Sequence, residues 1–148
     1  MRRFNSYGPI DMDLHYYAPR KTLIDNAYTR LLGENPQKGG HYITVWAPRQ
    51  TGKTWVMQEI LFQLKKNPRI DVLKINLESL KNETNVGAII ETITEEIGEG
   101  LNKSFTGVNT QQRFQKIFKR DVLDKPLILI LDEFDALTEK GINTIVSA

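Results

Sequence analysis

Residues 42–54 read YITVWAPRQTGKT and join an apolar run to a loop that ends in Gly-Lys-Thr. The loop matches the phosphate-binding pattern G-x-x-x-x-G-K-[ST] at Gly52, Lys53 and Thr54. It departs from the pattern once, because Ala47 stands where the first glycine is usual. The apolar run before Ala47 is β-branched and aromatic, which predicts a strand leading into the loop.

A helix is expected directly after the loop, because apolar residues recur at positions 56, 57, 60, 61 and 64 on one helical face. Gly52 would let the backbone come close to a phosphate, with amide N–H groups directed at the anion. Lys53 would reach the β and γ phosphates, and the Thr54 hydroxyl would bind magnesium. The predicted phosphate-binding set is Ala47, Pro48, Arg49, Gln50, Thr51, Gly52, Lys53, Thr54 and Trp55. The competing interpretation is a basic turn that only caps a buried helix.

A second motif, PLILILDE, occupies residues 126–133. Its uninterrupted apolar run predicts a central parallel strand that is buried on both faces. The carboxylates of Asp132 and Glu133 would then emerge at the carboxyl end of that strand, where ligands of open α/β sheets bind. Asp132 is expected to hold magnesium through water, and Glu133 to polarise the water that attacks the γ phosphate. Alternatively, the two acidic residues merely end a strand.

Residues 47–54 and 131–137, APRQTGKT and LDEFDAL, resemble the Walker A and Walker B motifs of AAA+ and STAND-type ATPases. The likeness is greatest to the microbial AAA-like group related to archaeal and origin-recognition ATPases. It implies ATP and Mg²⁺ as ligands and an α/β P-loop NTPase fold, a three-layer sandwich with a mostly parallel sheet. Residues 16–24, YYAPRKTLI, resemble the element with which those proteins contact adenine. Tyr17 to Leu23 would therefore lie beside the base, or else only pack the first helix.

The resemblance also implies the sheet order 5-1-4-3-2, in which a later strand separates the P-loop strand from the Walker B strand. The sequence ends at Ala148, soon after Glu133. The fold is therefore expected to be incomplete, without the strands that follow Walker B, the sensor residue, an arginine finger or the lid domain. The two strands could close the gap and pair directly, but we expect the gap to be filled by another copy or a partner, or to leave the isolated chain loose and aggregation-prone. The isolated chain should then hydrolyse ATP slowly at best.

The 148 residues fit one domain, and 40% apolar with 26% charged residues is ordinary for a globular chain. The sequence holds no cysteine, which excludes disulfides and thiolate metal sites, and His15 and His41 are too far apart in sequence to suggest a metal cluster. The formal charge of +2 does not indicate a partner. No apolar run approaches the ~20 residues of a membrane-spanning helix. A cytoplasmic protein without membrane contact is expected.

Along the chain, we expect an extended arm over residues 1–15 and the partial ATPase domain over residues 16–148. Helices are predicted over 19–32, from Thr84 or Asn85 to about Leu101, and from Asn109 or Thr110 onward, with a strand over 70–77. Gly98 and Gly100 are expected to weaken the end of the middle helix. Basic residues on and after the last helix could follow a phosphate backbone or simply be solvated; they are Arg113, Lys116, Lys119, Arg120 and Lys125. Nothing else in the sequence supports a nucleic-acid partner.

These observations predict a module that binds ATP and ADP, hydrolyses ATP, and acts as a nucleotide-dependent switch or motor core. The alternative is a hydrolysis-deficient module that serves protein contacts. Protein partners or self-association are expected in both cases. A GTPase is disfavoured because the guanine-reading Asn/Thr-Lys-x-Asp motif is missing from the sequence. The same motifs serve signalling, transposition, defence and replication, so they do not name the process.

Overall fold

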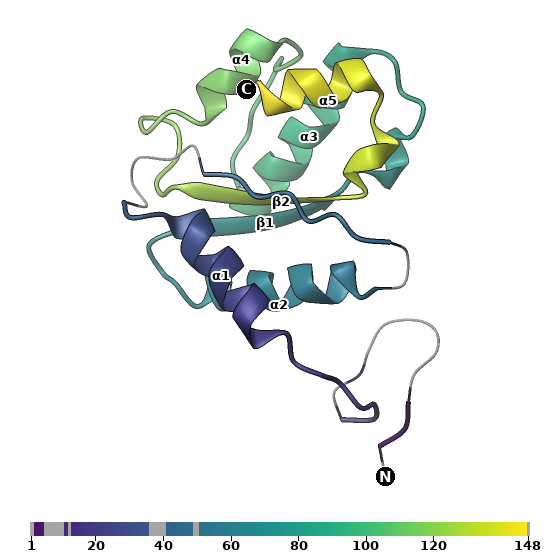
Figure 1. Cartoon of the computed structure of the whole chain (residues 1–148). Helices are drawn as coiled ribbons and strands as arrows, with labels where there is room; N and C mark the ends of the chain where they lie inside the picture. Colours follow the sequence, from purple (N-terminus) through teal and green to yellow (C-terminus); the bar gives the residue numbers. More distant parts are fainter. Residues whose placement is uncertain (1, 5–10, 12, 36–40, 49–50, 148) are drawn as a thin grey trace. The chain divides into compact units, whose positions relative to one another are not determined.

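The computed structural model describes residues 2–4, 11, 13–35, 41–48 and 51–147 (Figure 1). The chain forms two compact units, residues 1–64 and residues 65–148, which are described one after the other. Helices and parallel strands together make an α/β chain, in agreement with the α/β P-loop NTPase fold expected from the sequence.

The first unit is built on two helices. Helix α1, Lys21–Leu32, buries Ile24 and Ala27, and it ends at Gly33, whose φ of 59° suits glycine. Helix α2, Lys53–Lys65, begins at the phosphate-binding motif and carries a buried stripe of Val56, Ile60, Leu61 and Leu64. Both helices confirm the apolar spacing read from the sequence.

Residues that precede α1 include a short turn. His15 donates its backbone N–H to the carbonyl of Asp11, and the N–H of Asp11 returns a 2.9 Å bond to His15 Nδ1. An isolated parallel bridge joins Arg3 to His15. The predicted arm over residues 1–15 lies largely outside the described residues.

The strand predicted over Tyr42–Trp46 is wrong, because residues 41–48 have no regular secondary structure. Tyr42 is 83% exposed and Trp46 is 87% exposed, so the apolar side chains of this run are not buried. A strand is stabilised by a ladder to a neighbour and by side chains packed on its faces. In the described part of the chain, no strand pairs with this run, so its intrinsic preference is not realised.

The second unit contains a parallel pair, β1 (Asp71–Asn76) and β2 (Leu127–Asp132). The register places Asp71 opposite Leu127 and Asn76 opposite Asp132. Within the described residues the sheet has these two strands. Both strands were predicted from the sequence. In the order 5-1-4-3-2 that the resemblance implies, strands 2 and 3 are neighbours, as β1 and β2 are here.

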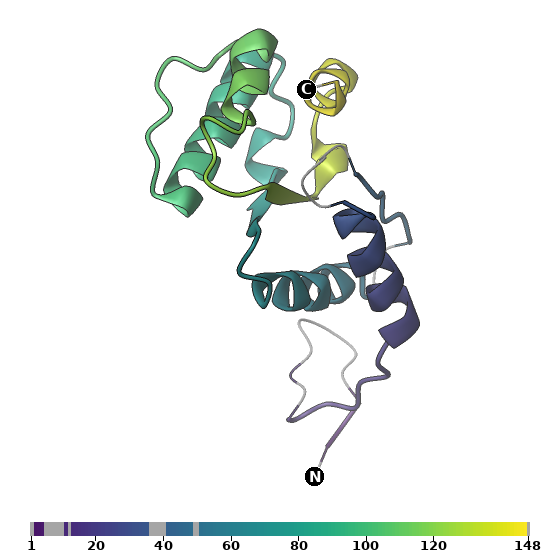
Figure 2. The same cartoon turned by 90° about the vertical axis from the view of Figure 1, so that its left-hand side faces the viewer.

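Three helices lie on the same side of the sheet in Figures 1 and 2: α3 (Val86–Leu101), α4 (Gln111–Ile117) and α5 (Glu139–Val146). Helix α3 contacts β1 and both other helices. Its fully buried isoleucines lie at the centre of the core with Leu77 and Phe114. Short 3₁₀ turns follow each strand, Glu78–Leu80 and Phe134–Ala136. The helix starts agree with the predicted caps, since Asn85 caps α3 and Thr110 caps α4.

Strand β2 packs against this core through one face, and its side chains are less buried than the sequence predicted for a central strand. Alternate residues pack against the core; they are Leu127, Leu129 and Leu131. Every side chain from Leu127 to Leu131 is half-buried, and only Asp132 at the end of the strand is buried.

The two glycines near the end of α3 permit close approach and do not stop the helix early. Gly98 accepts a backbone hydrogen bond of 2.9 Å from Lys103, and Asn102 adopts the left-handed conformation that ends the helix. A Cβ on Gly98 would lie 2.7 Å from the Lys103 carbonyl oxygen, and one on Gly100 would lie 2.5 Å from Leu73 Cδ2. Glycine therefore allows the helix end to lie against its own cap and against β1.

Candidate functional site

The loop that enters α2 is described at Ala47 and Pro48 and again from Thr51 onward. Gly52 has a φ of 80° and is exposed, and its carbonyl accepts the N–H of Val56 at 3.1 Å. The Thr51 hydroxyl donates to the Pro48 carbonyl at 2.7 Å and closes the turn. The first N–H groups of a helix have no partner within it, and an anion at the helix N-terminus can accept them.

Arg20 ties the loop to the segment before α1. Its Nη2 atom donates to the Thr51 carbonyl at 2.7 Å, across 31 positions of sequence. This arginine could not be assigned to the loop from the sequence, because the contact joins distant positions. A cationic anchor at the turn also adds positive charge where phosphate would bind.

Some of the other predicted loop residues are described by the structure and some are not. Ala47 does not have the left-handed φ that an L-residue avoids, so alanine is tolerated where the pattern has glycine. Lys53 is half-buried and Thr54 is exposed in the first turn of α2. The predictions for Arg49 and Gln50 concern positions outside the described residues.

A hollow of about 270 Å³ lies beside the loop. The segment before α1, the turn and the start of α2 line it with Tyr16, Tyr17, Ala18, Arg20, Thr51, Gly52, Trp55 and Val56. The segment predicted to contact adenine is thus next to the phosphate-binding turn. A second hollow of about 390 Å³ is lined by residues of α1, the 43–47 segment, Lys53 and Arg20.

Tyr17 holds this segment against α2. Its hydroxyl donates to Glu59 Oε2 at 2.7 Å, and its ring meets Trp55 edge-on with centroids 5.5 Å apart. Burial, followed by the neighbouring Glu59 carboxylate, raises the pKa of Tyr17 above 10.0. The indole N–H of Trp55 makes no hydrogen bond of ordinary geometry, although its nearness to the tyrosine oxygen slightly opposes that rise in pKa.

The acidic pair of the second unit stands at the carboxyl end of β2, as predicted. Asp132 is 9% exposed, and both of its carboxylate oxygens are engaged. Oδ2 is 2.8 Å from Lys74 Nζ, and Oδ1 accepts the N–H of Glu133 at 3.1 Å. Lys74 lies on β1, two residues before the position opposite Asp132. This ion pair depends on strand register and was not foreseen from the sequence.

Glu133 has a strained backbone. It is exposed, and its φ of 53° and ψ of 41° are left-handed values that a residue with a Cβ seldom adopts. Such a conformation costs of order 1–3 kcal/mol and persists where the surroundings fix it. Here the hydrogen bond from its N–H to Asp132 and the 3₁₀ turn that follows fix it.

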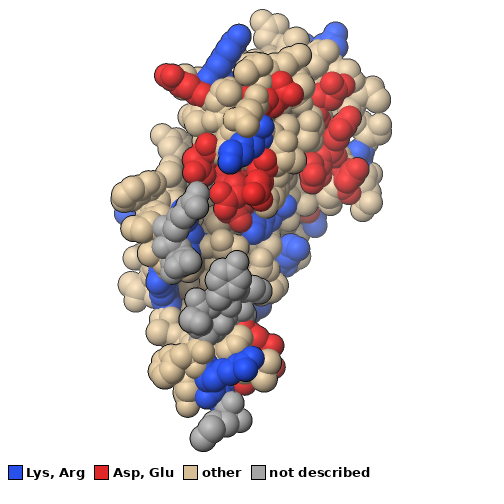
Figure 3. Space-filling model, turned by 90° about the vertical axis from the view of Figure 1, so that its right-hand side faces the viewer, with Lys and Arg blue, Asp and Glu red and all other residues tan. Residues whose placement is uncertain are grey.

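Acidic side chains gather on the face of the molecule onto which Figure 3 looks. Exposed carboxylates follow the ends of both strands; they are Glu78, Glu133, Asp135 and Glu139. Among the described residues no group of His, Cys, Asp or Glu side chains makes a metal site by itself. Magnesium is a hard cation that binds through one or two carboxylates together with substrate phosphates. The Thr54 hydroxyl and the Asp132 carboxylate are each oxygen donors of the kind that it prefers.

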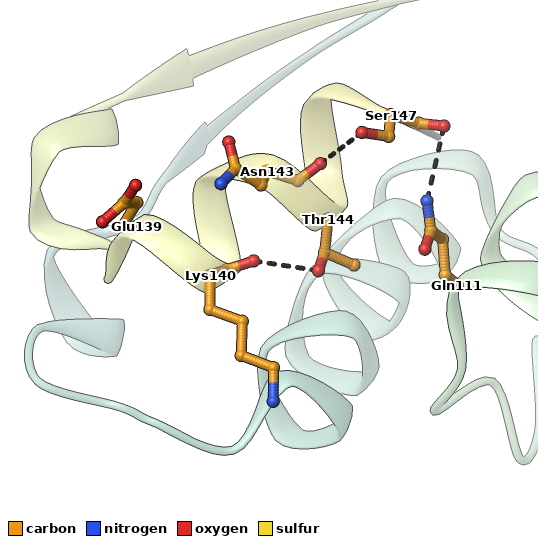
Figure 4. A pocket seen from close by; sticks show the side chains of 6 residues that line it. All are labelled: Gln111, Glu139, Lys140, Asn143, Thr144 and Ser147. Carbon is orange, nitrogen blue, oxygen red and sulfur yellow. Dashed lines mark hydrogen bonds between the residues drawn. The ribbon is translucent and has the colours of Figure 1, made fainter.

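The hollow between α4 and α5 has a different character. It measures about 420 Å³ and is lined by Gln111, Glu139, Lys140, Asn143, Thr144 and Ser147 (Figure 4). The Gln111 amide donates to the Ser147 carbonyl at 3.5 Å, and the Thr144 hydroxyl donates to the Lys140 carbonyl at 2.9 Å. These hydrogen bonds join α4 to the end of α5 and support the turns of α5, so they account for part of the polar lining without a ligand.

Comparison with known proteins gives one family and one relative. The model of the AAA domain family matches residues 37–148. The chain is also similar to an ORC1-type DNA replication protein 1 of Sulfurisphaera tokodaii, with 26% identity over 121 residues. The matched region is 81% of this chain and 29% of the relative, so the chain spans well under half of that protein. No solved structure matches.

Helices in the described residues are all too short or too polar to cross a membrane. The family match covers most of the chain and includes both motifs, the Gly-Lys-Thr turn at α2 and the acidic pair that ends β2. The chain therefore belongs to the AAA domain family of P-loop ATPases.

Proposed function

We propose that the chain binds ATP together with Mg²⁺ and uses the nucleotide as a conformational switch. The observation that carries the proposal is the turn before α2, with Gly52 at a φ of 80° and Arg20 anchoring the Thr51 carbonyl. That turn presents backbone N–H groups and the N-terminus of a thirteen-residue helix to an anion. A bound triphosphate would contact both the N–H groups of the turn and the N-terminus of the helix.

Four side chains of the two motifs have a role in this proposal. Lys53 binds the β and γ phosphates as a point charge, and Thr54 binds the metal through its hydroxyl. Asp132 holds the metal through water, and Glu133 accepts the proton of the attacking water. The metal would neutralise phosphate charge, which matters because exposed carboxylates follow both strands.

The base would occupy the hollow next to the turn. Tyr17 and Trp55 give it aromatic surface, and the Tyr17–Glu59 hydrogen bond fixes the position of the tyrosine. Aromatic rings with a few polar groups are typical of sites for flat ligands. The ring of Tyr16, which is exposed, adds a further contact surface.

The competing proposal is nucleotide binding without turnover, with the chain serving protein contacts. The left-handed backbone of Glu133 and its exposure are compatible with a base that has yet to be brought into position. The relative's name includes DNA replication, and the basic residues of α4 are exposed. Arg113, however, donates to the Gly107 carbonyl at 2.6 Å, so at least one of these cations stabilises a loop of the chain itself.

The proposal is tested by Lys53→Ala in the full chain. Charge-assisted contacts to phosphate contribute about 1.5–3 kcal/mol, so ATP affinity measured by calorimetry should fall about tenfold or more. Lys65→Ala is the matched control, because Lys65 is an exposed lysine at the other end of the same helix. Equal ATP affinity in Lys53→Ala and Lys65→Ala would refute the nucleotide site.

Turnover is tested separately with Glu133→Gln. The amide keeps the shape of the side chain but cannot take a proton, so hydrolysis should fall at least tenfold while ATP affinity stays unchanged. Phosphate release under saturating Mg·ATP is the measurement. Wild-type turnover in this variant would remove Glu133 from the mechanism, and an inactive wild type that still binds ATP would favour the competing proposal.

A further inference from the structure

Lys74 forms an ion pair with Asp132, the residue that is expected to hold the metal. We propose that Lys74 supplies the cationic charge at Asp132 before nucleotide binds and must leave when Mg·ATP arrives, so that it sets the magnesium requirement of the site. The inference rests on the proposed function and deepens it. Its starting point is the 2.8 Å contact between Lys74 Nζ and Asp132 Oδ2.

Register explains why Lys74 can reach the carboxylate. Lys74 is opposite Ile130 and Asn76 is opposite Asp132, so Lys74 and Asp132 are diagonal neighbours on one face of the parallel pair. The other face carries the leucines that pack against α3. A long side chain spans a diagonal of this kind, and a shorter cation would not.

Burial explains why the carboxylate needs a cation when no metal is bound. Asp132 has a side chain 11% exposed, and Lys74 has a side chain 23% exposed, so both charges are partly removed from water. A partly buried carboxylate without a counter-ion is unfavourable. The ammonium group of Lys74 meets this need, whereas Asn76 at the end of β1 is already engaged by the N–H of Glu78.

Competition between Lys74 and the metal follows from their like charge at one carboxylate. Oδ2 is held by Lys74, and Oδ1 is held by the N–H of Glu133. A hydrated metal at Asp132 would bring a second positive charge next to the Lys74 ammonium, and the two cations would repel each other. The metal-bound state is therefore disfavoured while the ion pair is intact, and the apparent metal affinity is reduced in proportion to the fraction of molecules that are unpaired.

Glu133 is coupled to the same event. Its strained backbone is fixed in part by its bond to Asp132 Oδ1. Rearrangement of the Asp132 carboxylate upon metal arrival would change that bond, and with it the position of the Glu133 side chain. Lys74 is thus a positioning residue that acts through Asp132 and touches no reacting atom.

The first test uses Lys74→Met, which keeps the length of the side chain and removes its charge. ATP binding to the full chain is measured at increasing magnesium. The half-saturating magnesium concentration should fall about tenfold, within the range usual for coupled sites. Lys74→Arg keeps a cation that can pair with Asp132 and should not lower it.

Lys103→Met is the matched control. Lys103 forms an ion pair of 3.0 Å with Asp124 in the same unit, so its loss tests whether removing any such pair has the effect. Its magnesium requirement should equal that of the wild type. An unchanged or increased requirement in a folded Lys74→Met chain overturns the inference, and an increase would mean that Lys74 assists the bound state.

The second test needs no variant and covers the case in which Lys74→Met fails to fold. Lysine side chains of the wild type are acetylated briefly and located by mass spectrometry, without nucleotide, with ATP and a chelator, and with Mg·ATP. Lys74 should react several-fold faster only with Mg·ATP, while Lys103 stays constant. Equal or slower labelling of Lys74 overturns the inference.

The two proposals fail in different ways. A wild type that binds no ATP overturns the proposed function and this inference with it. A wild type that binds ATP, loses that binding in Lys53→Ala, and has the same magnesium requirement as Lys74→Met leaves the function intact and removes the role of Lys74.

Discussion

Two apolar runs precede the two motifs of this chain, and they differ in outcome. Residues 127–131 become strand β2, whereas residues 42–46 have no regular structure. Both runs are rich in residues that favour strands. Composition therefore does not explain the difference in structure, which must come from the surroundings of each run.

Strand β2 has a partner and a cover. It pairs with β1 along its whole length, and alternate leucines lie against the core beneath α3. The earlier run has neither within the described residues, and its large side chains Tyr42 and Trp46 are exposed. Strand preference is thus expressed only where a ladder and an apolar layer are supplied by the rest of the chain.

The largest expected effect contrasts the core with the exposed run. Ile75→Ala, in β1 and 3% exposed, should reduce the free energy of unfolding by about 2–5 kcal/mol through lost burial and a cavity. Trp46→Ala should change it by no more than about 0.5 kcal/mol, because the side chain is 87% exposed. Urea unfolding measures both. A cost for Trp46→Ala similar to that of Ile75→Ala would show that residues 42–46 are packed in solution.

A smaller effect is expected at the end of α3, which covers β1. Gly98→Ala gains helix preference of up to ~1 kcal/mol. Its new Cβ would meet the Lys103 carbonyl at 2.7 Å, and overpacking of this kind costs about 1–3 kcal/mol. We expect a net loss of about 1–2 kcal/mol in urea unfolding. Glu99→Ala, at the exposed neighbouring position, is the control, and net stabilisation by Gly98→Ala would contradict the close approach.

Most of the fold could be predicted because its signals are local. Asn85 and Thr110 cap helices at the predicted starts, and α1 ends at Leu32, the last residue of the first predicted helix. Such patterns depend on residues a few positions apart, and they were confirmed. The strand over 42–46 failed because a strand depends on a partner that the run itself cannot specify.

The residues of the candidate site also differ in how well the sequence predicts them. Gly52, Lys53, Thr54 and the acidic pair are contiguous motifs, and the structure places them at a helix start and a strand end as expected. Arg20 at the Thr51 carbonyl, Tyr17 on Glu59 and Lys74 on Asp132 join distant positions. No local sequence pattern predicts these contacts, because they depend on the path of the chain and on strand register.

The smallest expected effect concerns a polar contact in the first unit, which has fewer buried residues than the core around α3. The pKa of Tyr17 is raised above 10.0 by burial and by Glu59, so the folded state keeps this proton at a pH where the unfolded state has lost it. The resulting contribution to stability is complete below about pH 10 and is lost as the pH rises through the folded value.

Tyr17→Phe should therefore flatten the decline of stability above about pH 10, while keeping the edge-on contact with Trp55. Below that pH the variant should be somewhat less stable than the wild type, because it lacks the hydrogen bond to Glu59. Urea unfolding at a series of pH values from about 8 to about 11 gives both comparisons. Tyr42→Phe is the control, since Tyr42 is 83% exposed and should leave the alkaline decline as it is in the wild type. An alkaline decline in Tyr17→Phe as steep as that of the wild type would mean that the Tyr17–Glu59 contact does not hold the aromatic segment to α2 in solution.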